Sequence, residues 1–168
     1  QRDTTWARHL KFLQGNDDES KRGAGYWFWK AALMVRLLDE IIEENMIVVY
    51  SDPDRPVADM GTVEWGNLLK AMELYDIAVT NMHGTYDEES YTKADILDYF
   101  GSKARNPNST TTGQYEASAF VVRNTAPSRQ FFRRWRSLVS NFHLVSDEPS
   151  MTAESPKFKE NRHDQSLF

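Results

Sequence analysis

The amino-acid sequence predicts an α/β sandwich, in which helices pack against a central β-sheet. Apolar residues at helical spacing alternate along the chain with short runs of β-branched and aromatic residues, as in α/β folds. The chain has 168 residues, of which 40% are hydrophobic, and this is enough for one domain with a core. No internal repeat or low-complexity tract interrupts the pattern. We therefore expect residues 1–168 to form a single domain.

The first half of the chain contains three predicted helices and two predicted strands. The second helix has the clearest signal, because its apolar residues recur at helical spacing. The strand after it is rich in β-branched residues, which is typical of a buried strand. In chain order we expect a helix over 4–14, a helix containing Leu33, Met34, Leu37, Leu38, Ile41 and Ile42, a strand over 46–50, a loop over 51–62, a helix over 64–74 and a strand over 76–80.

The second half contains two long predicted helices. The first covers 90–100 and ends at Gly101, and Ser90 or Thr92 is expected to cap it. Residues 114–123 form one strand or two short ones, and Pro127 begins a helix over 127–143. The apolar stripe of this last helix is Phe131, Trp135, Leu138, Val139 and Phe142. Its opposite side carries Arg129, Arg133, Arg134 and Arg136, which we interpret as a solvated helix face rather than a binding patch.

Composition excludes some functions. The net charge of −5 makes nucleic acid a poor partner, and the absence of cysteine excludes disulfides and thiolate metal sites. No apolar run is long enough for a membrane span. Asn108-Ser109-Thr110 matches a glycosylation acceptor, but so short a match leaves open whether the compartment is the cytoplasm or the Golgi lumen. Because the chain begins at Gln1 in a helical pattern and stops at Phe168 just after an apparent helix start, we expect a domain truncated at both ends.

Two acids follow the predicted strand over 46–50. Asp52 and Asp54 are separated by one proline, and a strand that ends in acids delivers carboxylates to the edge of a sheet, where open α/β folds bind ligands. Hard oxygen ligands of this kind suit Mg²⁺ or Mn²⁺, which in turn hold phosphates. A polar turn after a strand is the alternative interpretation of the same residues.

Two further segments are dense in chemically useful residues. The block Gly25-Tyr26-Trp27-Phe28-Trp29-Lys30 places aromatic rings, which stack on a base or a sugar, beside an ammonium that suits a phosphate. Core packing explains some of these rings equally well. In the second block, His163 is a candidate metal ligand, Asp164 a candidate base and Gln165 a candidate hydroxyl binder. Asp164 could instead be a helix cap.

In their order along the chain, these segments resemble a glycosyltransferase of the GT-A fold. More narrowly, they are similar to the small microbial and algal-virus-type domains that carry G-Y-W-x-W-K and H-D-Q-S blocks. The resemblance covers residues 22–168, and no single block is decisive. Its blocks are Gly25–Lys30, Val48–Asp54, Tyr91–Asp95, Gln114–Ser118 and Asn161–Ser166.

The resemblance implies a GT-A-like (Rossmann-like) three-layer sandwich, with a mixed central sheet flanked by helices. It also implies transfer of a sugar from a UDP- or GDP-sugar to a hydroxyl of a carbohydrate or glycan acceptor. By this comparison Asp52 and Asp54 would bind Mn²⁺ or Mg²⁺ and the donor diphosphate, and Asp164 would be the catalytic residue near the transferred sugar. The donor-binding residues would be Tyr26, Trp27, Lys30, Asp52, His163 and Gln165.

The chain departs from the family pattern in two places. Proteins of this fold begin with a nucleotide-binding strand, and none precedes residue 22, so either that strand lies upstream or nucleotide binding is impaired. Many relatives also have Asp-Ala-Gly where this chain has Asp52-Pro53-Asp54. Two alternative functions stay open. One is a haloacid-dehalogenase-like phosphatase, which expects Thr or Val at the position of Pro56, and the other is a non-catalytic sugar-binding or scaffold module.

Overall fold

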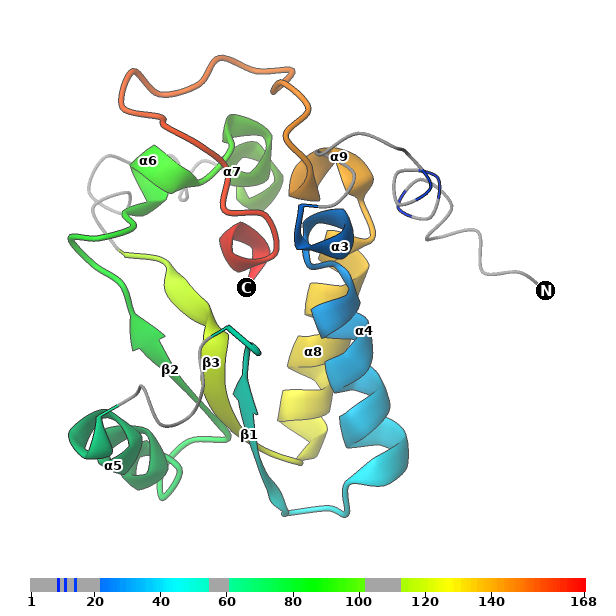
Figure 1. The fold of residues 1–168 in the computed structure, drawn as a ribbon, viewed down its shortest axis with the longest axis vertical. Coiled ribbons are helices and arrows are strands. Elements are labelled where there is room, and N and C mark those ends of the chain that lie inside the picture. Colours follow the sequence, from blue (N-terminus) through cyan, green and yellow to red (C-terminus); the bar gives the residue numbers. More distant parts are fainter. Residues whose placement is uncertain (1–8, 10, 12–13, 15–21, 55–60, 102–112) are drawn as a thin grey trace.

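The computed structural model describes residues 9, 11, 14, 22–54, 61–101 and 113–168, and within them the sheet has three strands (Figure 1). The strands are β1 (Ile47–Ser51), β2 (Ile77–Asn81) and β3 (Tyr115–Arg123), in the spatial order β1-β3-β2. Helices pack around this sheet, so the expected α/β class is confirmed. The sequence left open whether residues 114–123 form one strand or two, and in the structure they form the single strand β3.

The expectation of a mixed sheet is wrong for the described strands, because both pairings are antiparallel. In the register Val49 lies opposite Val121, and Ile77 lies opposite Val122. The chain passes from β1 through α5 (Thr62–Ala71) to β2, and these two strands run in the same direction. They are not neighbours, however, since β3 lies between them and opposes both. The alternation of helices and strands in the sequence predicts the connection from β1 through α5 to β2. It does not predict that β3, which comes later in the chain, lies between these two strands.

One face of the sheet is covered by α4 (Trp29–Arg36) and α8 (Ala126–Val139), and this interface holds the larger core. The helix predicted around Leu33–Ile42 is present, but it changes at Leu37 into a π-helical turn, Leu37–Ile41. Fully buried side chains fill the space between helices and sheet. The largest of them are Met34, Leu38, Phe120, Phe132 and Trp135.

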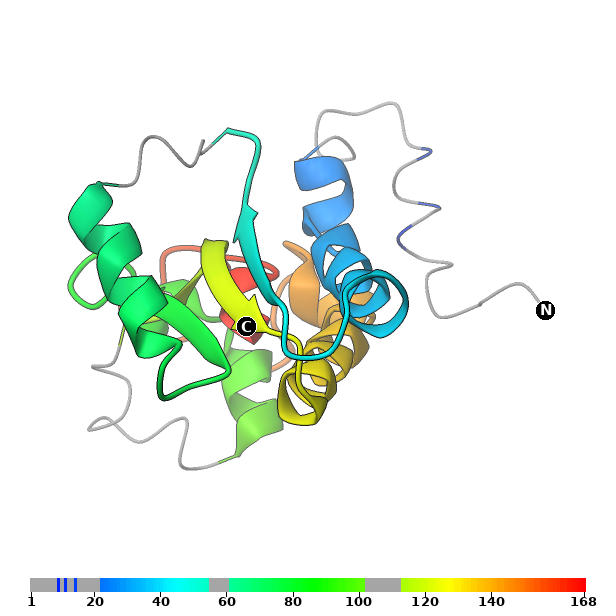
Figure 2. The ribbon, with the colours of Figure 1, turned by 90° about the horizontal axis from the view of Figure 1, so that it is seen from below.

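The opposite face is covered by α5, as the view from below shows (Figure 2). Its residue Leu68 packs with Met72 on Ala78, Ala119 and Val121 in a second, smaller core. This helix contacts β2 and β3, so the outer face of β1 is left open and Val49 is 46% exposed. The expectation that residues 46–50 form a buried strand is therefore wrong: β1 is an edge strand with one buried face.

The helix expected over 90–100 is broken into α6 (Glu88–Tyr91) and α7 (Ala94–Phe100), and Gly101 ends it at φ 90° as predicted. The expected cap is wrong. Thr92 donates its hydroxyl to Glu88 and accepts a hydrogen bond from Gln114 Nε2 at 2.8 Å. The backbone N–H of Ala94, in the first turn of α7, donates instead to Glu154 Oε2 at 2.9 Å, from a segment distant in the sequence.

The helix predicted over 127–143 is α8 followed by the short α9 (Phe142–Val145). Thr125 and Ser128 form a capping box at its start, with proline in the first turn. Phe142 of the predicted stripe belongs to α9. Of the arginines on α8, Arg133 and Arg134 are exposed, as expected for a solvated helix face, whereas Arg129 and Arg136 are half-buried. Arg133 also pairs with Asp39 at 2.8 Å.

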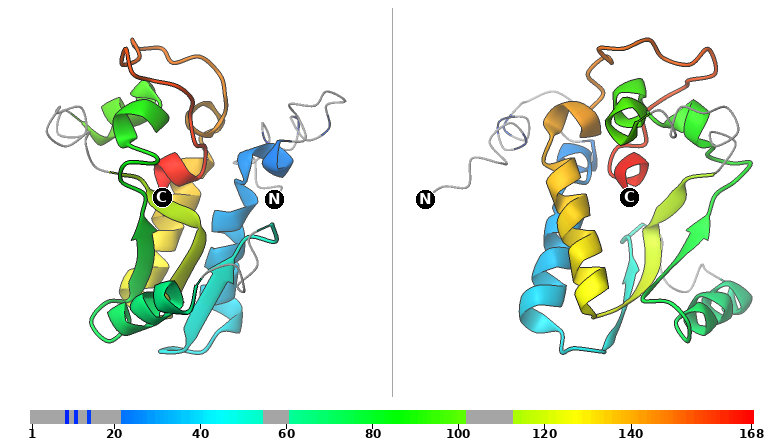
Figure 3. Two further views of the ribbon diagram at one scale, coloured as in Figure 1. Left: turned by 60° about the vertical axis from the view of Figure 1, so that its left-hand side comes forward. Right: turned by 180° about the vertical axis from the view of Figure 1, so that it is seen from behind.

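After α9 the chain forms an irregular arch and returns to the middle of the molecule as the short 3₁₀-helix η4 (Gln165–Leu167), shown in red in Figure 3. There η4 contacts β3 and α8, and Phe168 packs on Trp135. The helix expected over 4–14 lies mainly outside the described residues. Within the part of the chain that the structure describes, no helix is both long and apolar enough to cross a membrane.

Candidate functional site

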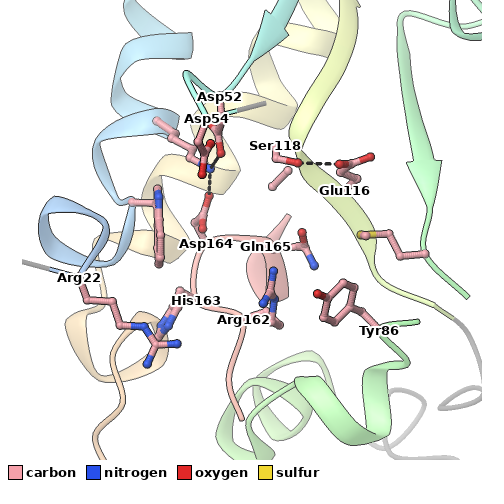
Figure 4. Close-up of a pocket in the computed structure, with 14 residues that line it drawn as sticks. Arg22, Asp52, Asp54, Tyr86, Glu116, Ser118, Arg162, His163, Asp164 and Gln165 are labelled. Atoms are coloured by element: carbon pink, nitrogen blue, oxygen red, sulfur yellow. Dashed lines mark hydrogen bonds and ion pairs between the residues drawn. The ribbon is translucent and has the colours of Figure 1, made fainter. Parts of the chain in front are cut away.

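A pocket of about 390 Å³ opens where five segments that are distant in the sequence meet (Figure 4). The pocket is lined by the residues that flank α3 (Gly23–Tyr26) together with the start of α4, by the residues after β1, by the residues after β2, by β3 and by the C-terminal segment. The residues that line it are Arg22, Trp27, Lys30, Asp52, Asp54, Met82, Tyr86, Glu116, Ala117, Ser118, Arg162, His163, Asp164 and Gln165. Of the predicted site residues, all except Tyr26 line this pocket.

The aromatic block reaches the pocket through an unusual backbone turn. Tyr26 and Trp27 both have left-handed backbone conformations, with φ of 61° and 58°. The indole of Trp27 lies so close to Gly23 that a β-carbon there would come within 2.2 Å of the ring. Glycine at position 23 therefore allows Trp27 to fold back over the turn. Trp29 closes the turn by donating Nε1–H to the Gly23 carbonyl at 3.1 Å.

Lys30 is buried and lies between two aspartates. Its Nζ is 2.7 Å from Asp52 Oδ2 and 3.3 Å from Asp164 Oδ2. Asp52 is held from three sides, since Tyr50 donates its hydroxyl to Oδ1 at 2.6 Å and the Asp52 N–H binds the Ser118 carbonyl at 2.8 Å. Burial and the bond to Asp52 raise the pKa of the Tyr50 hydroxyl, so it stays a donor. One ammonium thus contacts two carboxylates that lie far apart in the sequence.

Asp164 is the least satisfied member of this group. Only 4% of the residue is exposed, and among the described residues its Oδ2 has no hydrogen-bond partner, with Lys30 at ion-pair distance only. Burial raises its pKa to about 7; the Lys30 charge opposes this rise, and the Asp52 charge adds to it. The indole N–H of Trp135 binds the Asp164 carbonyl at 3.0 Å and fixes the backbone. Its carboxylate makes no cap to η4, so the alternative role as a helix cap is wrong.

His163 is a buried neutral imidazole in the same turn of chain. Its Nδ1 lies 2.9 Å from the Val145 carbonyl, and because a carbonyl only accepts, we place the proton on Nδ1. Burial lowers the pKa of this histidine, which keeps the ring neutral. Tyr26 stacks on it with 4.7 Å between ring centres. Tyr26 therefore supports the pocket from behind, with 3% of its surface exposed.

The predicted metal ligands differ in their surroundings. Both carboxylate oxygens of Asp52 are engaged, by Lys30 and by Tyr50. Asp54 is exposed at the pocket rim. Within the described ranges, no group of three or more histidine, aspartate or glutamate side chains is arranged to hold a metal ion. Of these two acids Asp54 is the exposed one, and a Mg²⁺-type cation held by it would have to take its remaining ligands from outside this pair.

Sequence reasoning missed five charged or polar residues of the pocket as site residues. Glu116 is 1% exposed and accepts a hydrogen bond from the Ser118 hydroxyl at 2.6 Å. An acid inside an otherwise apolar strand was the available signal for it. Arg162 lies next to His163 in the Asn161–Ser166 block, which was the available signal for it. Arg22 and Tyr86 gave no such signal, because nothing in their sequence context separates them from surface residues.

Two segments with chemically useful residues do not reach the pocket. Asp95, from the Tyr91–Asp95 block, lies under the irregular arch and binds His143 at 2.6 Å. His83 is exposed and pairs with Asp87 at 3.1 Å. The first has a structural role, and the second is a surface pair.

No protein-family model, no curated protein and no solved structure matches this chain. The geometry of the pocket is therefore the ground on which function is inferred.

Proposed function

We propose that this chain is a glycosyltransferase domain of the GT-A type, which moves a sugar from a nucleotide-diphosphate sugar to an acceptor hydroxyl. The observation that carries the proposal is the buried group Asp52–Lys30–Asp164 at the floor of a pocket large enough for a sugar. Its three members lie in three of the five blocks on which the family resemblance rests. Their convergence supports the resemblance, since it brings residues of distant blocks together around one buried lysine.

Asp164 is suited to act as the general base. A base works best when its pKa lies near the working pH, and the pKa of Asp164 is about 7. In the proposed step, Asp164 Oδ2 takes the proton of the acceptor hydroxyl while the acceptor oxygen forms a bond to the anomeric carbon. The bond from that carbon to the phosphate oxygen breaks, and its electron pair leaves with the nucleoside diphosphate. A carboxylate at this position also stabilises positive charge that develops on the sugar ring.

The donor phosphates are proposed to lie at the Asp54 side of the pocket. Lys30 lies at this end of the pocket, where its charge, paired with Asp52 and Asp164, reduces the repulsion between these carboxylates and the phosphates, and Trp27 lines the pocket beside it. A divalent cation, Mn²⁺ or Mg²⁺, would be held by Asp54 together with the phosphates, and it would neutralise charge on the departing diphosphate. Asp52 would join it as a ligand only by giving up a contact with Lys30 or Tyr50.

Calorimetric titration of the full chain with UDP and with GDP, with and without Mn²⁺, tests the proposal. We expect binding that Mn²⁺ strengthens and that D54N weakens by about tenfold, which corresponds to one lost charged contact. The matched control is D98N, an exposed acid on α7 outside the pocket, which should bind as the parent chain does.

Other outcomes decide between the remaining functions. The absence of any metal-dependent nucleotide binding would contradict the transferase proposal. Release of phosphate from a generic phosphate ester would favour a phosphatase. Glycan binding that survives both D54N and chelation would favour a non-catalytic sugar-binding module.

A further inference from the structure

Arg162 differs from the other cations of the pocket because, within the described residues, its guanidinium donates no hydrogen bond to a carboxylate. Lys30 is bound by Asp52, and Arg22 donates to Asp147 at 3.1 Å. Across the described parts of the chain, the guanidinium of Arg162 has no hydrogen bond, and the nearest carboxylate is that of Glu160 at 3.6 Å. The side chain of Glu160 is 43% exposed, so this ion pair is weak and an incoming anion can replace it.

The structure nevertheless holds Arg162 in place. Its guanidinium lies over the ring of Tyr86, 4.3 Å from the ring centre. Its backbone N–H is bound by the Ser166 hydroxyl at 3.0 Å and by the Tyr91 carbonyl at 3.2 Å. A cation–π contact and a fixed backbone both reduce the entropy that the side chain loses on binding a ligand. Arg162 is therefore a preorganised donor group.

Its position places it across Asp164 from the phosphate side of the pocket. In Figure 4, Asp52 and Asp54 lie together at one end, Asp164 comes next, and the guanidinium of Arg162 follows beside Gln165 and Tyr86. If the donor phosphates lie near Asp54, the transferred sugar lies near Asp164, and the molecule that receives it faces Arg162. Arg162 and Asp164 line the same pocket, so one molecule bound there is within reach of both side chains.

The geometry points to an acidic acceptor: we infer that Arg162 binds a carboxylate or phosphate group carried by the sugar or glycan that receives the transferred sugar. A guanidinium presents parallel N–H donors that match the two oxygens of such a group. Tyr86 supports the guanidinium from one face and leaves its edge for the ligand. The identification of this ligand as the acceptor rests on the proposed function, whereas the acid-binding role of Arg162 does not.

Ligand-observed NMR titrations with two matched sugars test the inference. Methyl glucuronide and methyl glucoside differ only in the carboxylate at C6, and glucose 6-phosphate supplies the phosphate form. We expect the full chain to bind the glucuronide or glucose 6-phosphate at least about tenfold more tightly than the glucoside. Equal binding of the charged and neutral sugars, or no binding of any of them, overturns the inference.

Variants identify the residue that is responsible. R162Q should abolish the preference for the acidic sugar, and R162K, which keeps the charge but lacks the planar fork, should retain only part of it. R136Q, on α8 outside the pocket, is the matched control and should behave as the parent chain does. Because the side chain of Arg162 is 35% exposed, we expect R162Q to fold, and a thermal melt checks this. A preference for the acid that persists in R162Q contradicts the role of Arg162.

The anion that Arg162 binds could belong to the acceptor or to the phosphates of the donor, and UDP binding to R162Q distinguishes the two. An unchanged UDP affinity supports the acceptor role, whereas a loss of UDP affinity of tenfold or more places the donor phosphates on Arg162 and overturns it. The same measurements separate this inference from the proposed function. If the chain binds UDP but does not prefer acidic sugars, only the inference about Arg162 is contradicted. If it prefers acidic sugars but binds no nucleotide, only the proposed transferase function is contradicted.

Discussion

Asp95 and Asp164 are both buried aspartates, yet their surroundings shift their pKa values in opposite directions. Asp95 accepts hydrogen bonds from His143 Nε2, from the backbone N–H groups of Met151 and Thr152, and from the Thr152 hydroxyl, at 2.6 to 3.1 Å. Burial alone would raise its pKa, but these donors outweigh it and lower the pKa to about 2. Asp164 has an oxygen without a hydrogen bond, and burial raises its pKa to about 7.

The difference shows what the two carboxylates can do. A carboxylate that is fully hydrogen-bonded stays charged, and it stabilises the elements that supply the donors. Here Asp95 ties α7 to the irregular arch that leads towards His163. A carboxylate that is buried with few hydrogen-bond donors has a pKa closer to neutral pH, and it is therefore available for proton transfer. The two sites thus divide structural and chemical roles within one domain.

The largest expected effect is on transfer activity. In D164N the proposed base cannot accept a proton, so we expect the transfer rate to fall by about 100- to 10,000-fold. Nucleotide affinity should change by no more than about twofold, because Asp164 is placed at the sugar and not at the phosphates. Product formation from a UDP- or GDP-sugar and calorimetric titration measure the two quantities. A loss of donor affinity as large as the loss of rate would mean that Asp164 acts in binding.

The next effect is on the stability that Asp95 provides. D95N leaves His143 and the two N–H groups of the arch with a neutral, poorer acceptor, and we expect a loss of about 3 kcal/mol in the free energy of unfolding. Urea unfolding followed by circular dichroism measures it. The control D98N, on the exposed side of the same helix, should change stability by less than about 0.5 kcal/mol. A D95N loss as small as that of the control would show that the arch is held by other contacts.

The pH dependence of stability should have opposite signs at the two sites. The depressed pKa of Asp95 provides stability that is present above the pKa of the unfolded chain, near 4, and is lost as the pH falls towards 2. The raised pKa of Asp164 means that the folded chain holds a proton that the unfolded chain has released between about pH 4 and pH 7. Stability at this site therefore falls as the pH rises through that window.

Replacing Asp164 should remove the second effect. Between pH 5 and pH 8, we expect D164N to gain about 2 kcal/mol of unfolding free energy relative to the parent chain. Urea unfolding of both chains at the two pH values measures the difference. Parallel pH profiles for the two chains would show that the pKa of Asp164 is not raised by folding.

The smallest expected effect comes from the support of Asp52. Y50F removes the hydroxyl that donates to Asp52 Oδ1, and one such hydrogen bond contributes about 1 kcal/mol. The same substitution frees one oxygen of Asp52, so Mn²⁺ affinity should rise if this carboxylate is a metal ligand. Y75F, at an exposed tyrosine near α5, is the control. Unchanged Mn²⁺ affinity in Y50F would leave Asp54 as the metal-binding acid.

Much of the local structure was predictable because it depends on neighbouring residues. The β-branched run before Asp52 gave a strand, the apolar spacing after Trp29 gave a helix, and Gly101 gave a helix end. The errors arose where distant contacts decide. The cap of α7 comes from Glu154, and the exposure of Val49 depends on which strands α5 covers. Neither contact leaves a local pattern in the sequence.

For the candidate site, the sequence by itself determined which residue types were available and the order in which the chain presents them. It indicated Lys30, Asp52 and Asp164 as separate candidates, and the structure places both carboxylates within 3.3 Å of the Lys30 ammonium. Only the tertiary structure decided that Asp95 is saturated with donors while Asp164 is not. The pKa of a buried carboxylate depends on its burial and on the donors around it, and folding supplies both from distant parts of the chain.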